Sequence, residues 1–156
     1  MKIATSEEVE KVKSKFGLEP LSKNFTLKKF QNIFTNKKTS IKAILMNQEL
    51  IAGIGNIYAD EICFCAKVLP TRAASKLTPA EIKKLYDCIP KILQEAIKHR
   101  GTTFKDFRDS DGKKGNYTNF LQVYDRDGEI CRRCGSIIKK TRVAGRGTRC
   151  CLHCQK

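Results

Sequence analysis

Apolar residues recur at helical spacing in several segments between residues 27 and 100. Thr26, Ser40 and Thr78 each stand just before such a segment and can cap it, and Gly101 can end the last one. Thr78 is also followed by a proline at the first helical position and by a glutamate at the capping-box position. The predicted helices cover residues 27–34, 41–48, 56–66 and 79–100.

The remaining segments lack this pattern. Residues 1–24 are polar and lysine-rich, and we interpret them as a linker or as the remnant of a domain that is missing upstream. Residues 102–117 are polar and contain glycines, which is typical of a long loop. Short strands and turns surround cysteines from residue 121 onward. The sequence therefore predicts a mostly α fold, with a helical domain over 25–120 and a small β unit over 121–156.

The composition adds a strong positive charge. Lys and Arg number 31 against 16 Asp and Glu, which gives a formal net charge of +15. An excess of this size favours a polyanionic partner, because each phosphate that a cation neutralises releases counterions. A basic protein without such a partner is the alternative.

Cysteine usage and the start of the chain bear on its compartment. Eight cysteines would suit a secreted disulfide scaffold, but the polar first residues have no signal-peptide pattern. No apolar run of about 18 residues occurs, so no membrane span is expected. We therefore expect a reducing, intracellular setting, the cytoplasm or the nucleoid.

Four of the cysteines form two C-x-x-C pairs. Cys131 and Cys134 are separated from Cys151 and Cys154 by 16 residues. Each pair can place two thiolates on one tight turn, and a hairpin between the pairs would bring the turns together. Four thiolates favour Zn²⁺ in a closed, structural site, with iron as a weaker alternative. Disulfides or free thiols are the other interpretation.

Two turns that contain glycine are candidates for phosphate contact. The turn that ends in Gly55-Asn56 opens a helix, whose free N–H groups and dipole favour an anion, and Lys37 and Lys42 are nearby in sequence. A dinucleotide-binding turn would follow a strand, whereas a helix is predicted here. Arg146 lies between two glycines of the predicted hairpin, where its guanidinium can reach phosphates or base edges. An ordinary helix–helix corner and a solvated turn are the respective alternatives.

Four motifs follow one another along the chain: Ile51-Ala-Gly-Ile-Gly-Asn-Ile-Tyr-Ala-Asp-Glu61, Gly101-Thr-Thr-Phe-Lys-Asp-Phe107, Leu121-Gln-Val-Tyr124, and the finger segment from Gly145-Arg-Gly-Thr148 to Cys154-Gln155. In this order they resemble the formamidopyrimidine-DNA glycosylase and endonuclease VIII family, over residues 17–156. The resemblance implies a helix–two-turn–helix domain with a zinc-bound β-hairpin finger, which grips duplex DNA around an extruded, oxidised purine in base-excision repair.

The resemblance also implies roles for single residues. Two lysines and the asparagine beside the glycine turn match positions that hold backbone phosphates. Lys105 belongs to the loop that closes over the extruded base. Arg146 matches the finger arginine credited with phosphate contact and with proton donation in the δ-elimination step. The expected DNA contacts are Lys37, Lys42, Gly55, Asn56, Lys105, Tyr124 and Arg146.

The first residues depart from the family's pattern. Family enzymes begin with Met-Pro-Glu, whose proline amine attacks the sugar, and continue into a β-sandwich catalytic domain. Met1-Lys2-Ile3 does not match that start, so we expect the β-sandwich domain, its proline nucleophile and its glutamate to be absent. Whether the chain is an enzyme is left open.

The sequence thus predicts a zinc-bearing module that binds damaged duplex DNA. It would act as the DNA-gripping half of a bifunctional glycosylase and abasic-site lyase, with a separate amino-terminal catalytic half as a further possible partner. One alternative is a compact enzyme in which the Met1 amine or a lysine is the nucleophile. The other is a zinc-ribbon module that binds RNA or serves as a protein scaffold.

Overall fold

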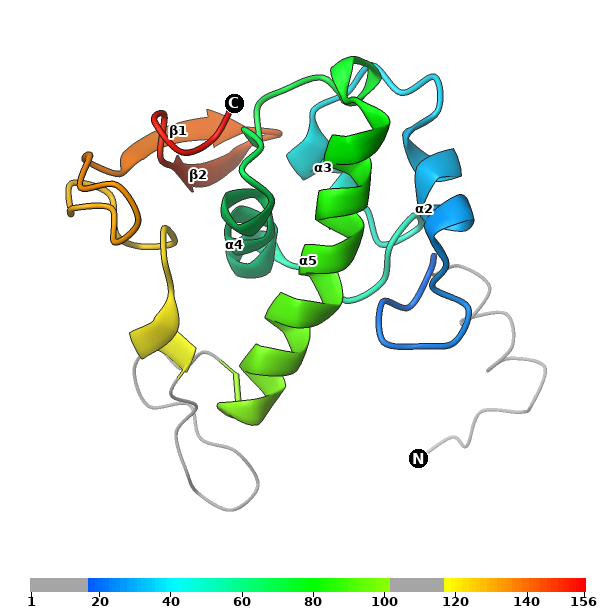
Figure 1. Cartoon of the computed structure of the whole chain (residues 1–156), viewed down its shortest axis with the longest axis horizontal. Helices are drawn as coiled ribbons and strands as arrows, with labels where there is room; N and C mark the ends of the chain where they lie inside the picture. Colours follow the sequence, from blue (N-terminus) through cyan, green and yellow to red (C-terminus); the bar gives the residue numbers. More distant parts are fainter. Residues whose placement is uncertain (1–16, 102–116) are drawn as a thin grey trace, which may run out of the picture.

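A computed structural model describes residues 17–101 and 117–156 of the chain (Figure 1). Lys105 and the predicted loop, apart from its last residue, lie outside the described residues. Among the described residues, no helix combines the length and apolar character that a membrane crossing requires.

The predicted helix starts are confirmed. Thr26 and Ser40 each accept a hydrogen bond from a backbone N–H of the first turn, and Thr78 forms a reciprocal capping box with Glu81. The second helix ends two residues earlier than predicted, where Asn47 takes an extended backbone conformation. Beyond it, the Gln48 side chain accepts from the N–H of Gly53 at 2.8 Å. The α-helices are α2 (Leu27–Phe34), α3 (Ile41–Met46), α4 (Asn56–Ala66) and α5 (Pro79–Lys98).

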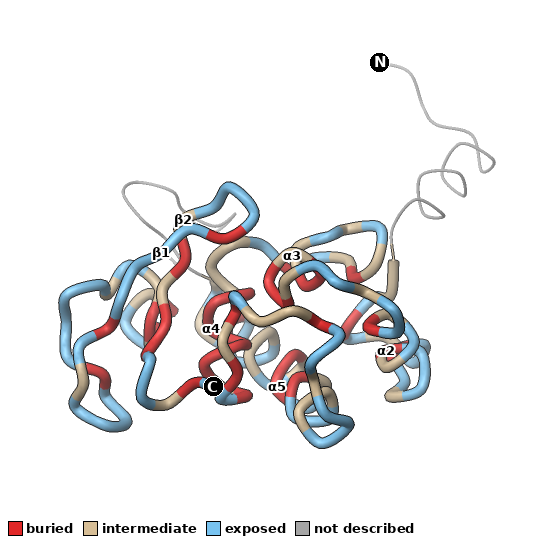
Figure 2. The backbone as a smooth tube through the Cα atoms, turned by 90° about the horizontal axis from the view of Figure 1, so that it is seen from above, coloured by how far each residue is buried: buried red, intermediate tan, exposed pale blue. Residues whose placement is uncertain are grey.

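Helix α4 occupies the centre of the helical part. It packs against α3, α5 and the second strand of the finger, and most of its residues are buried on all sides (Figures 1 and 2). A helix that is apolar around its whole circumference belongs in a core. Two acidic residues of α4, Asp60 and Glu61, are nevertheless buried with it. Short 3₁₀ helices, η1 (Ala74–Lys76) and η2 (Tyr117–Phe120), flank α5 in sequence.

The last segment forms a two-stranded antiparallel hairpin, β1 (Lys139–Val143) and β2 (Arg146–Cys150). Val143 pairs with Arg146, so Ala144 and Gly145 alone make the turn. Both have positive φ, 52° and 76°, as a type I′ turn requires. Over the described residues, the helices and this small hairpin confirm the prediction of a mostly α fold with a small β unit.

The finger is docked onto the helical part by backbone hydrogen bonds. The buried Glu61 carboxylate accepts the N–H groups of Gln122, Val123 and Tyr124 at 2.8–2.9 Å. Burial raises the pKa of Glu61, and these three donors oppose that shift. The chain end is held as well, because Lys156 donates its N–H to the carbonyl of Lys67 at 3.1 Å. The two parts therefore share one interface along α4.

Candidate metal centre and nucleic-acid interface

The four predicted ligands meet at one point of the finger. The Sγ atoms of Cys131, Cys134, Cys151 and Cys154 all lie within 4.8 Å of one another. Cys131 Sγ is 3.9 Å from Cys154 Sγ, and Cys134 Sγ is 3.4 Å from Cys151 Sγ. Tetrahedral Zn²⁺ with Zn–S bonds of about 2.3 Å sets its thiolates about 3.8 Å apart. The donor set and its spacing therefore fit one structural zinc ion.

The first cysteine turn has the backbone that such a ligand pair needs. Gly135 donates to the carbonyl of Cys131 at 2.8 Å and has φ of 81°, a conformation that favours glycine. The N–H of Ser136 then points at Cys134 Sγ at 3.5 Å. Hydrogen bonds from Ser136 lower the pKa of the Cys134 thiol to about 6, whereas burial raises the pKa of the Cys151 and Cys154 thiols.

Lys42, expected to contact phosphate, is fully buried between α3 and the finger. Its Nζ lies 2.8 Å from Asp60 Oδ1 and donates to Thr148 Oγ1 at 2.7 Å and to the carbonyl of Gly147 at 3.1 Å. Burial raises the pKa of Asp60, and the Lys42 ammonium opposes that shift. The structure thus places Lys42 in an internal ion pair and not on the surface.

Asn56 is the first residue of α4 and reaches the same hairpin. Its Nδ2 donates to the carbonyl of Gly147 at 3.2 Å, whereas its Oδ1 is buried and has no hydrogen-bond partner among the described residues. Gly55 caps α4 without any side-chain hydrogen bond, so the first turn of the helix offers its N–H groups to an outside acceptor. Arg146, at the exposed end of β2, directly precedes Gly147. The helix start and the hairpin tip therefore form one continuous surface.

Two other expected contacts, Lys37 and Tyr124, are among the described residues. Lys37 lies in the turn after α2, where its N–H donates to the carbonyl of Phe34 at 3.3 Å. The Tyr124 ring packs under the Arg149 guanidinium, with 4.8 Å between Cζ and the ring centroid. Both residues are half-buried.

Four residues of the interface were missed by reasoning from the sequence: Asp60, Glu61, Thr148 and Gln155. Each is buried and polar, and each joins the finger to the helices. The Gln155 carboxamide accepts from the N–H of Cys151 at 2.7 Å and donates to the carbonyl of Val68 at 2.9 Å. Two adjacent acids within an otherwise apolar helical segment were the available signal, because buried carboxylates need partners.

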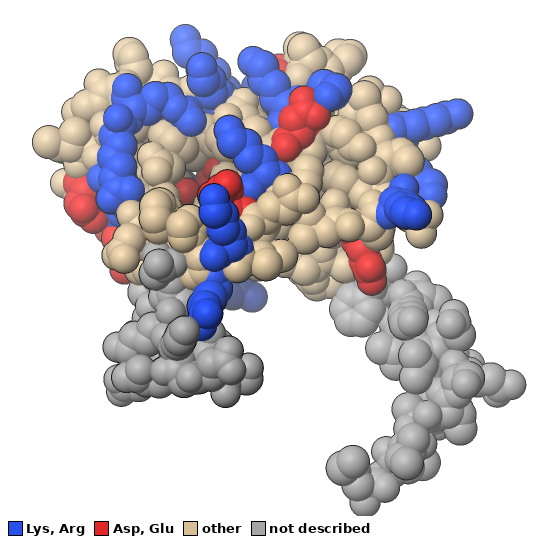
Figure 3. Space-filling model, turned by 60° about the horizontal axis from the view of Figure 1, so that its bottom comes forward, with Lys and Arg blue, Asp and Glu red and all other residues tan. Residues whose placement is uncertain are grey.

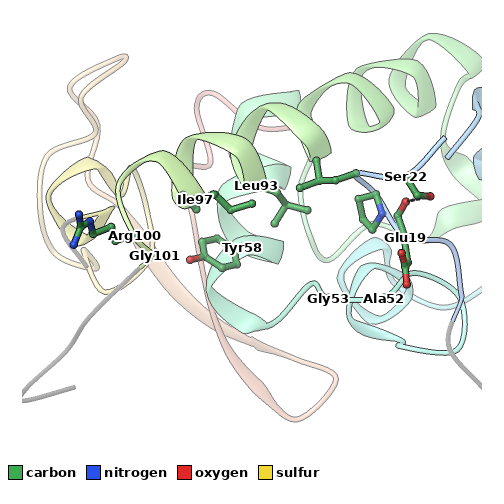
Figure 4. Close-up of a pocket in the computed structure, with 12 residues that line it drawn as sticks. Glu19, Ser22, Ala52, Gly53, Tyr58, Leu93, Ile97, Arg100 and Gly101 are labelled. Atoms are coloured by element: carbon green, nitrogen blue, oxygen red, sulfur yellow. Dashed lines mark hydrogen bonds between the residues drawn. The ribbon is translucent and has the colours of Figure 1, made fainter. Parts of the chain in front are cut away.

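A separate groove of about 750 Å³ lies along α5 (Figure 4). Leu93, Ile97 and Tyr58 line its middle, with Glu19 and Arg100 toward opposite ends. This mostly apolar lining does not suit a phosphate backbone. Lys and Arg side chains, in contrast, predominate over Asp and Glu on the face shown in Figure 3.

Comparison with protein families accounts for both parts of the molecule. Residues 16–108 match the model described as the formamidopyrimidine-DNA glycosylase H2TH domain. Residues 128–156 match the zinc finger found in FPG and IleRS. This match and the cysteine cluster support a structural zinc ion.

Relatives and solved structures agree with these matches. The formamidopyrimidine-DNA glycosylase of Symbiobacterium thermophilum is 50% identical over 139 residues, which cover 89% of this chain and 46% of the relative. A complex between the Lactococcus lactis Fpg and DNA containing an abasic site has a TM-score of 0.90 at 39% identity, covering 98% of this chain and 57% of that one. The MutM (Fpg) protein of Thermus thermophilus has a TM-score of 0.86 at 40% identity, covering 90% and 54%. The chain thus spans about half the length of the relatives that it matches.

Proposed function

Because the chain belongs to the formamidopyrimidine-DNA glycosylase family, we propose that it binds damaged duplex DNA in base-excision repair. The helical domain (residues 25–120) and the zinc finger (residues 121–156) would grip the duplex together. A DNA-containing, reducing compartment of the cell is the matching location.

One observation carries this proposal: the start of α4 and the tip of the hairpin meet at Gly147. Asn56 touches its carbonyl oxygen, and Arg146 is its neighbour in the chain. An amide N–H, a helix amino terminus and a planar guanidinium are three groups that proteins use to hold phosphate oxygens. Their meeting within one small surface favours a two-point grip on a DNA backbone.

Charge and relatives support the same partner. A formal net charge of +15 suits a polyanion, and phosphate contacts of this kind dominate duplex affinity. The Lactococcus lactis relative was solved with DNA that contains an abasic site, and another structure of it holds DNA with an N7-benzyl-Fapy-dG lesion.

Further contacts follow from the family resemblance. Lys37, Gly55, Lys105 and Tyr124 would add contacts to the duplex or to the displaced base. Lys42, which is buried, would support these contacts through its hydrogen bonds to the hairpin. Arg146 would also donate the proton of the last elimination step at an abasic site. The base-excision and lyase chemistry of the family would then be performed with a catalytic amine positioned beside the gripped duplex.

The test is a binding titration by fluorescence anisotropy with a duplex that contains one abasic-site analogue. A structured RNA of equal length is measured in parallel at matched salt. We expect tighter binding to the duplex, with an affinity that falls steeply as salt rises. Equal or tighter binding to the RNA would favour an RNA-binding zinc ribbon instead.

A further inference from the structure

The Lys42 ammonium is engaged inside the protein, by an ion pair with Asp60 and by two hydrogen bonds to the hairpin. An ammonium group carries three N–H donors. Three acceptors surround Lys42 Nζ within hydrogen-bonding distance: Asp60 Oδ1 at 2.8 Å, Thr148 Oγ1 at 2.7 Å and the carbonyl of Gly147 at 3.1 Å. Lys42, Asp60 and Thr148 are all 0% exposed. The positive charge of Lys42 is thus paired inside the protein, where α3, α4 and β2 meet.

The contacts of this cluster lead directly to the backbone of the hairpin tip. The Thr148 hydroxyl, which accepts from Lys42, donates its own hydrogen to the carbonyl of Arg146 at 3.0 Å. Asp60 uses its second oxygen, Oδ2, to accept the N–H of Arg149 at 3.0 Å. The buried pair therefore fixes β2 on both sides of Thr148.

Stability alone is a poor explanation for such a pair. Removing two charges from water costs several kcal/mol per ion, and apolar residues of similar volume often serve stability equally well. What a buried pair with directed hydrogen bonds adds is a single geometry. Here that geometry sets where the peptide of Arg146 lies relative to the start of α4.

We propose that Lys42 and Asp60 are positioning residues, which lock the hairpin tip so that Arg146 and Asn56 face the same stretch of DNA backbone. This inference rests on the proposed function, because the tip is taken to be a phosphate contact. Lys42 contributes through Thr148 and Gly147, and it does not itself contact DNA.

The deciding variant is Asp60→Asn, measured for affinity toward the abasic-site duplex. The substitution removes a negative charge and makes the protein more cationic. Electrostatics alone therefore predicts unchanged or tighter binding. The positioning role predicts weaker binding, by roughly fivefold or more. Unchanged or tighter binding by a folded Asp60→Asn protein would overturn the inference.

A double-mutant cycle of Asp60→Asn with Arg146→Ala tests whether the buried pair acts through Arg146. If the pair acts by placing the tip, Arg146→Ala weakens binding by a much smaller factor in the Asp60→Asn background than in the wild type. Equal factors in the two backgrounds would mean that the pair does not act through Arg146. Lys84→Ala, an exposed lysine on α5, serves as the charge-loss control for the cycle.

Thr148 provides a second test without a charge change, in case Asp60→Asn loses its zinc or its helical signal. Thr148→Val removes the hydroxyl that joins Lys42 to Arg146, and Thr148→Ser retains it. We expect weaker binding for the valine variant and near wild-type binding for the serine variant, with zinc bound in both. Equal affinities for the two would contradict the inference. Wild-type protein in the same titration keeps the proposals apart, since a wild type that fails to bind the duplex contradicts the proposed function itself.

Discussion

The side chains of Lys42 and Asn56, from two different helices, end on the same atom of the finger. Lys42 Nζ and Asn56 Nδ2 donate to the carbonyl oxygen of Gly147 at 3.1 Å and 3.2 Å. One donor comes from the buried side of the hairpin and the other from the start of α4. The helical part and the finger therefore meet next to Arg146. A change in how they pack would alter the position of the hairpin tip relative to the start of α4.

Zinc removal is expected to unfold the finger and leave the helices. Few large side chains pack in the finger, whereas the helical core contains Phe30, Ile44 and Leu85. Cys151→Ser should lose the single zinc ion per chain and the folded hairpin, while most of the helical circular dichroism remains. Cys150→Ser, in the adjacent position outside the ligand set, is the control and should keep its zinc on metal analysis. Full zinc retention by Cys151→Ser would refute the ligand set.

Glu61→Gln should weaken the docking of the finger. The carboxylate accepts from three backbone N–H groups through both of its oxygens. An amide replaces one acceptor by a donor, which leaves at least one buried N–H without a partner. We expect a loss of about 1–3 kcal/mol in the free energy of unfolding, measured by urea titration of the zinc-loaded protein. Glu49→Gln, at an exposed position, should change it little.

The Arg72–Glu81 pair should make stability depend on pH. Arg72 hydrogen-bonds to Glu81 and, at 3.0 Å, to the carbonyl of Lys156, so it ties α5 to the end of the finger. The Arg72 guanidinium holds the pKa of Glu81 below its ordinary value. Because the pKa of Glu81 is lower in the folded state than in the unfolded state, its charge stabilises the fold at neutral pH. This contribution is lost as the pH falls through the folded-state pKa of Glu81. Glu81→Gln retains a capping-box side chain and removes the charge.

For this variant, the difference in free energy of unfolding from wild type should therefore be present at pH 7 and shrink in acid. Parallel denaturant titrations over that pH range measure it. A difference that stays constant with pH would show that the charge of Glu81 has no role.

Ala144→Asn should stabilise the hairpin. Ala144 has φ of 52°, a left-handed conformation that costs alanine about 1 kcal/mol and that asparagine tolerates better. The new Asn-Gly pair is the preferred type I′ turn, so the register at Arg146 is retained. We expect a higher melting temperature for the finger with unchanged DNA affinity. Ala144→Val should lower the melting temperature, and a rise there would contradict the turn assignment.

Short sequence patterns were enough to predict the helix starts and the metal cluster. Capping residues marked three helix starts, and the C-x-x-C pairs marked the metal cluster, because each depends on neighbours a few residues away. The pairing of Lys42 with Asp60 depends on how α3 and α4 pack, and helical spacing does not report it. Lys42 was expected to contact phosphate from its place near the glycine turn and from the family resemblance, although it is the only charge in the otherwise apolar α3.

The central claim is that Asn56 and Arg146 both contact the DNA backbone and jointly hold the duplex. Its most direct measurement is the affinity of Asn56→Ala, Arg146→Ala and the Lys84→Ala control for an abasic-site duplex, each over a salt series. Asn56→Ala and Arg146→Ala should each weaken binding by about 1–3 kcal/mol, and Arg146→Ala should reduce the salt slope by about one charge. Lys84→Ala should bind nearly as the wild type. If both interface variants bind as tightly as Lys84→Ala at moderate salt, the two-point grip is wrong.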